Sequence, residues 1–242
     1  MIKFFRHIRQ RLISEGKTGK YLKYAIGEIV LVVIGILIAL QINNWNENRK
    51  DRIVEKEILT ELIATAKSNH ESLLKGLKSW GSTAKSLDLI MRVIDQRLPY
   101  ADSLAGYFEE AHRKRGNNLN GLNFSGYKSL ENRGYHLIRN RELRKEIINL
   151  FEQRQSRLSA TNNQVDIDNS SFHYEYIAKN FRLEDKGHIP HSYQSLLDDP
   201  FYYSILKGLE TSLDRKINRV YGFLTRNKQF LELLETELSV LD

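Results

Sequence analysis

The chain of 242 residues contains no cysteine, so disulfide bonds are excluded as a source of stability. The absence is compatible with a reducing or an oxidising compartment and does not locate the protein. Long apolar runs are also scarce. Every residue of segment 29–40 is apolar or glycine, and no second run of this kind follows. The sequence therefore predicts at most one membrane crossing.

The usual motifs of catalysis and metal binding are missing as well. Gly16-Lys17-Thr18 resembles the end of a phosphate-binding loop, but Arg11 stands where that loop needs a glycine. His188 and His191 are three residues apart, yet Pro190 prevents the regular helix that would aim both at one metal ion. Solvated loop histidines are the ordinary explanation. We therefore expect a protein that is not an enzyme and holds no cofactor and no metal.

Positive charge is concentrated at the N-terminus. Seven Lys and Arg residues and one Glu lie within residues 1–24, so this segment carries +6 of the net charge of +7. The remaining 218 residues are nearly neutral and lack the basic surface that nucleic-acid binding requires. We expect no nucleic-acid partner.

Residues 24–45 are predicted to form a transmembrane helix. At 1.5 Å per residue the segment measures about 33 Å, enough for a hydrocarbon core of about 30 Å, with Tyr24 and Trp45 at the two interfaces. The predicted organisation is a basic cytoplasmic leader (1–23), the span (24–45) and an extracytoplasmic helical domain (46–242). Within the leader, residues 2–14 have the spacing of an amphipathic helix, although a basic tail that only sets topology is equally compatible.

The charge asymmetry also predicts an orientation, because basic flanks stay in the cytoplasm. We expect the N-terminus inside and the C-terminal domain in the periplasm of a bacterial cell. A cleaved signal peptide is the competing interpretation. The long segment before the span, and the lack of a small-x-small cleavage site at its end, favour an uncleaved signal anchor in the inner membrane.

One face of the span combines its charged residue with its small residues. Steps of three and four lead from Glu28 to Gly35 and Ala39. Gly35 and Ala39 form a small-xxx-small pair, which lets two helices approach closely and predicts a homo-oligomer. Glu28 has three possible roles: an interfacial anchor, an oligomer contact, or an ion or proton site.

The stretch YAIGEIVLVVIGILIALQINNWNE, residues 24–47, resembles the N-terminal signature of an uncharacterised family of single-span envelope proteins of Bacteroidota. The resemblance is specific over residues 1–50 and looser beyond them. It implies an envelope location and no known activity or cofactor.

The remainder of the chain is predicted to be all-α, with elongated helices of coiled-coil character. A long helix over residues 46–98 has apolar positions seven apart, among them Leu73 and Trp80. Shorter helices are expected over 103–115, 124–138 and from 143 onwards, with loops over 116–123 and 183–200. The last helix, 201–241, has a second seam that contains Leu224, Asn227 and Leu231, in which Asn227 can fix register and partner number.

These patterns favour a structural or scaffold protein that presents a helical bundle outside the membrane. Its expected partners are the lipid bilayer, further copies of the chain and another envelope protein. Two alternatives remain: an extracytoplasmic ligand-sensing domain, and an accessory subunit of a membrane complex in which Glu28 serves an ion or a proton.

Overall fold

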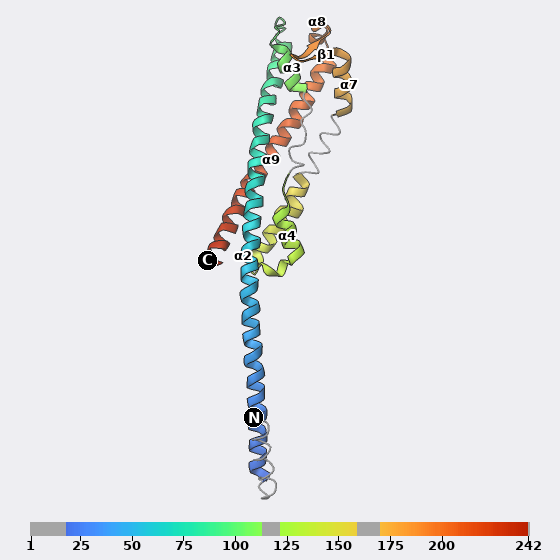
Figure 1. Ribbon diagram of the computed structural model, residues 1–242. Helices are drawn as coiled ribbons and strands as arrows, with labels where there is room; N and C mark the ends of the chain where they lie inside the picture. The colour runs from blue at the N-terminus through green and yellow to red at the C-terminus, as the bar shows by residue number, and fades with distance from the viewer. Residues whose placement is uncertain (1–17, 113–121, 159–169, 242) are drawn as a thin grey trace. The chain divides into compact units, whose positions relative to one another are not determined.

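The computed structural model describes residues 18–112, 122–158 and 170–241, and most of them are helical (Figure 1). The predicted all-α class is confirmed. The chain divides into two compact units, Met1–Val54 and Glu55–Asp242, and helix α2, Thr18–Asp95, contributes residues to both. The expected amphipathic segment 2–14, the loop residues 116–121, and residues 159–169 beyond the helix expected from 143 lie outside the described residues.

In the first unit, α2 exposes its apolar run. The large apolar side chains of residues 29–40 are 47–63% exposed. Among the described residues this is the one helix long and apolar enough to cross a membrane, and none of its most apolar window, with a mean hydropathy of 2.6, is buried within the chain. A core helix of a soluble protein would instead be covered by its neighbours.

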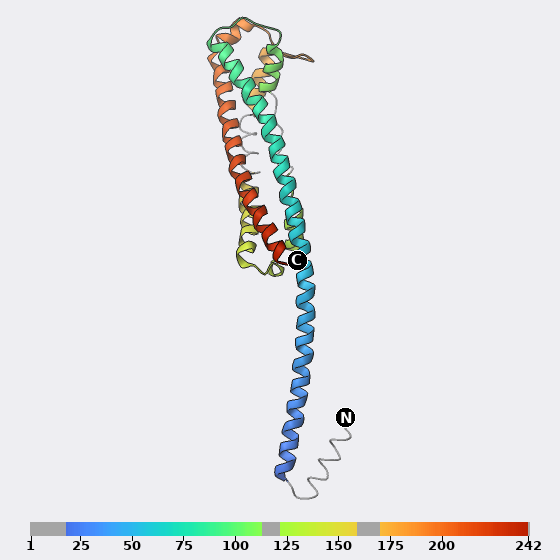
Figure 2. The same ribbon diagram turned by 90° about the vertical axis from the view of Figure 1, so that its left-hand side faces the viewer.

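In the second unit, helix α9, Pro200–Leu241, crosses α2 at a small angle in Figure 1 and runs alongside it in Figure 2. The α2 residues of this contact form a heptad column in which every member is buried: Leu59, Ala66, Leu73, Trp80, Leu87 and Ile94. The buried column of α9 has the same spacing: Leu206, Leu213, Val220, Asn227 and Leu234. Seven-residue spacing keeps each column on one helix face, so the two columns form the core.

One charged residue of α9 is buried. Lys216 is only 4% exposed, and its Nζ lies 4.9 Å from the centre of the Trp80 ring. The long lysine stem covers apolar surface while the ammonium meets the face of the indole.

Four short elements cover one end of this pair of helices: α4 (Ser125–Arg133), the 3₁₀ helix η1 (Tyr135–Leu137), α5 (Arg141–Ile148) and the π-helix η2 (Asn149–Gln155). Asn140 begins α5 by accepting from the amides of Glu142 and Leu143. Gly126 permits close contact with α2, because a Cβ there would lie 2.7 Å from the Glu61 carbonyl oxygen.

The opposite end contains α3 (Leu104–His112), α7 (Ser170–Asn180), strands β1 (Phe181–Glu184) and β2 (Gly187–Pro190), and α8 (Tyr193–Leu197). The strands form an antiparallel hairpin that pairs Phe181 with Pro190. The prediction of a loop over 183–200 was therefore wrong. Gly187, at φ 123°, packs against α3, where a Cβ would lie 2.3 Å from the Ala105 carbonyl oxygen.

The first long helix is also shorter than predicted. It ends at Asp95 rather than at residue 98, and Arg97 follows with φ 49°, in the left-handed region. A left-handed residue terminates an α-helix, and Pro99 then prevents its resumption.

Candidate functional site

The residues predicted to mediate association of the span lie on α2 in the first unit. Gly35 and Ala39 are exposed, and Glu28 is half-buried. A Cβ built on Gly35 would meet no atom within 4 Å. The structure thus places a small-residue surface on this helix that no other described part of the chain fills.

The predicted bundle seam lies between α2 and α9. Leu73 and Trp80 are each 1% exposed, and Leu224 is 7% exposed. Asn227 is buried, and its Nδ2 donates to the carbonyl oxygen of Ala66 over 2.9 Å. Leu231 is only half-buried, because the core column of α9 passes through Asn227 and Leu234 instead.

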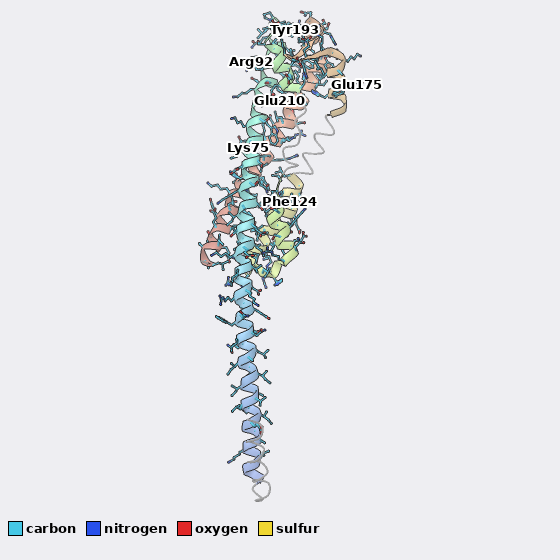
Figure 3. All side chains as sticks on the ribbon, viewed as in Figure 1. Lys75, Arg92, Phe124, Glu175, Tyr193 and Glu210 are labelled. Carbon is cyan, nitrogen blue, oxygen red and sulfur yellow. The ribbon has the colours of Figure 1, made fainter. Side chains whose placement is uncertain are left out.

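A cluster of imidazole and phenol groups lies in the second unit, at the end marked by Tyr193 and Arg92 in Figure 3. His112 ends α3, His188 is on β2, His173 is on α7, and Tyr202 is in the first turns of α9. We call these four residues the histidine–tyrosine cluster. Four separate elements thus meet at the His112 ring, so the cluster exists only when the whole end is assembled.

Hydrogen bonds connect three members of the cluster in a row. The Tyr202 hydroxyl lies 2.8 Å from His112 Nε2, and His112 Nδ1 lies 3.1 Å from His188 Nδ1. Two facing ring nitrogens can share one proton but cannot both carry one. The short distance therefore requires that at least one of His112 and His188 is neutral.

Aromatic rings enclose this row. The Phe181 ring meets His112 edge-on at 4.7 Å between centroids, and Tyr176 stacks on Tyr202 at 5.4 Å. Burial lowers the pKa of His188, a shift that the carboxylate of Glu109 partly opposes. Burial also raises the pKa of Tyr202 well above its ordinary value. At neutral pH the row therefore contains the uncharged phenol of Tyr202 and the neutral imidazole of His188, one on each side of His112.

Tyr202 is held in place by the start of α9. Asp199 Oδ1 accepts hydrogen bonds from the amides of Phe201 and Tyr202, as expected for an N-cap before Pro200. Its Oδ2 accepts from the Tyr176 hydroxyl over 2.5 Å, and burial followed by this hydrogen bond raises the pKa of Tyr176. The cap thus orients both phenols of the stack.

The cluster corrects the interpretation of the loop histidines. His191 is exposed, but His188 is half-buried against His112. Within the described ranges, no group of three or more His, Asp or Glu side chains has an arrangement suited to a metal ion. The chemistry available to the cluster is proton exchange along a hydrogen-bonded row.

Sequence reasoning missed His112, His173 and Tyr202 as members of a site. His112 and Tyr202 are 90 residues apart, and the histidines belong to three elements. No local spacing could indicate their contact. The pattern His188-Ile189-Pro190-His191 was the only local signal, and it pointed to one of the four residues.

Comparisons with known proteins give a match to one family model. Neither a curated protein nor a solved structure matches the chain. Residues 28–101, less than half of the chain, match the model of a family of unknown function (DUF6090). The matched segment contains Glu28, Gly35, Ala39, Leu73 and Trp80, so it includes most of α2 and none of the histidine–tyrosine cluster. Over residues 28–101 the chain thus resembles an uncharacterised domain.

Proposed function

We propose that the protein is a non-enzymatic single-pass protein of the bacterial inner membrane, which presents a helical domain in the periplasm for self-assembly or for binding another envelope protein. The exposed apolar run of α2 is the observation that carries this proposal. Ten large apolar side chains between residues 29 and 40 are each about half exposed or more. A lipid bilayer would cover all sides of such a helix.

The distribution of charge supports the proposed orientation. The segment before the span carries +6, and retention of basic flanks in the cytoplasm directs the domain outwards. A fluorescent reporter that matures only in the cytoplasm tests this. Fused after residue 242 it should stay dark in intact cells, whereas an N-terminal fusion should fluoresce. Fluorescence from the C-terminal fusion would show that the orientation is inverted.

Self-assembly is proposed to use the face that contains Glu28, Gly35 and Ala39. The open space at Gly35 allows a second backbone to approach, and close approach is what drives helix association in lipid. The chain has no cysteine, so single cysteines at positions 35 or 39 are unambiguous probes. They should crosslink in native membranes, whereas a cysteine in place of Leu37, on the opposite face, should not.

Three substitutions separate the contribution of packing from that of charge. Gly35→Ile should abolish the crosslink at position 39, while Leu37→Ile should leave it unchanged. Glu28→Gln addresses the alternative roles: unchanged assembly and unchanged membrane potential would exclude an oligomer contact and an ion role for this carboxyl. A monomeric mass in detergent together with no crosslink at 35 or 39 would contradict self-assembly through this face.

A further inference from the structure

A cavity of about 580 Å³ opens between the π-helix η2 and α9 in the second unit. Its floor is apolar, because Leu150 and Phe230 are buried there, and Leu233 at its side remains 49% exposed. The volume lies in the range of small-molecule sites, roughly 300–1,000 Å³. A π-helix is rare and recurs at functional sites.

The two helices that border the cavity are antiparallel. At one end, Asn140 Nδ2, just before α5, donates to Glu237 Oε2 over 2.6 Å, and further along the Phe151 and Phe230 rings lie 6.0 Å apart. The lining residue Glu146 therefore faces the C-terminal part of α9. Arg154, two turns later, faces its earlier part.

This register sorts the charged lining by sign. Glu146 and Glu232 belong to one end of the cavity, and Arg154 and Arg226 belong to the other. Among the described residues none of these four side chains makes an ion pair or a hydrogen bond. Two like charges at the same end of a cavity attract a group of the opposite sign, so each pair favours an oppositely charged group of an occupant.

The separation of the two ends defines the size of that occupant. The six residues from Arg226 to Glu232 in α9 correspond to about 9 Å. An extended chain of three residues spans about 10 Å at 3.3–3.6 Å per residue. Guanidinium groups bind carboxylates in a bidentate manner, and carboxylates accept from an ammonium group.

We propose that this cavity binds a short apolar peptide of about three residues with free termini. Its carboxylate binds Arg154 and Arg226, its ammonium group binds Glu146 and Glu232, and its side chains cover the apolar floor. The inference goes beyond membrane anchoring and assembly, because it gives the external domain a small-molecule ligand.

Calorimetric titration of the full-length protein in lipid nanodiscs tests the proposal, with trileucine, N-acetyl-trileucine and trileucine amide as probes. Trileucine should bind at least tenfold more tightly than either blocked form, because each blocked form loses one charged end. The R154Q/R226Q variant should bind trileucine at least tenfold more weakly than the unmodified protein does, and its affinity for trileucine amide should be unchanged. The E146Q/E232Q variant should lose the same affinity for trileucine, and its affinity for N-acetyl-trileucine should be unchanged.

Arg219 provides the matched control, because it is exposed on α9 outside the cavity. R219Q should bind all three peptides as the unmodified protein does. The proposal is overturned by absence of trileucine binding at millimolar concentration, by equal affinity for the three peptides, or by insensitivity to both double variants. A change of oligomer mass in R154Q/R226Q without peptide binding would identify a second copy as the occupant, and would also overturn it.

Discussion

The hydrogen bond between Tyr202 and His112 gives a quantitative prediction for Tyr202→Phe. Tyr202 is fully buried, and its hydroxyl lies 2.8 Å from His112 Nε2. Phenylalanine keeps the ring and its stacking on Tyr176 but leaves a buried ring nitrogen without this partner. Such a loss costs about 1–3 kcal/mol, which lowers the folding equilibrium constant about fivefold to 150-fold.

The chain contains a suitable reporter for this measurement. It has two tryptophans, and Trp80 is buried in the second unit, 1% exposed. In a Trp45→Phe background, fluorescence therefore follows unfolding of that unit alone during a urea titration in detergent. The fitted free energy of unfolding is compared among Tyr202→Phe, Tyr203→Phe and the background protein.

Tyr203→Phe is the matched control. Its hydroxyl donates to Asp95 Oδ2 over 3.3 Å in an exposed position, so its removal should change the free energy of unfolding by less than about 0.5 kcal/mol. If Tyr202→Phe is as stable as Tyr203→Phe, the buried hydrogen bond does not stabilise this end of the unit and the reasoning is refuted.

Three further predictions concern the second unit. Burial holds the pKa of His188 below its unfolded value of about 6.5, so the folded state binds fewer protons than the unfolded state. The stability present at pH 8 should therefore decline as pH falls through 6.5 towards 5. His188→Gln should reduce the slope of the free energy of unfolding against pH, measured by urea titration at each pH. Gly126→Ala should destabilise the second unit by about 1–3 kcal/mol, because the added methyl group clashes with α2. Gly222→Ala should be neutral or slightly stabilising, because position 222 has open space around it and a helical backbone. Equal thermal midpoints for the two variants would contradict this. Asn69→Ala should cost about 1–3 kcal/mol, because the amide of Asn123 loses an acceptor at 2.6 Å, and hydrogen exchange at that amide should rise; unchanged protection would count against the bond.

The long helices could be predicted from the sequence because their signals are local and repeated. Heptad spacing through Leu73 and Trp80 identified the buried face of α2. The sequence does not decide between two possible columns on α9. Leu231 and Asn227 both fit a seven-residue pattern, and only the position of the neighbouring helices decides which of them is buried.

The short elements and the candidate sites could not be predicted in the same way. The hairpin 181–190 has strands of four residues without alternating burial, and its position depends on the contact of Gly187 with α3. The π-helix η2 has no sequence signature of its own. The histidine–tyrosine cluster and the cavity between η2 and α9 both join residues tens of positions apart, so tertiary packing creates them.

The pairing of α2 with α9 has a consequence for biosynthesis. Asn227 and Ala66 are 161 residues apart, and the core column of α2 is covered by the final helix of the chain. About 145 residues separate the end of α2 from the end of α9. At a synthesis rate of roughly 5–20 residues per second, the α2 face around Trp80 stays uncovered for roughly 7–30 s, until the ribosome has completed α9. During that interval an apolar helix face is accessible to aggregation or to a chaperone, and a chain that stops before residue 200 never covers it.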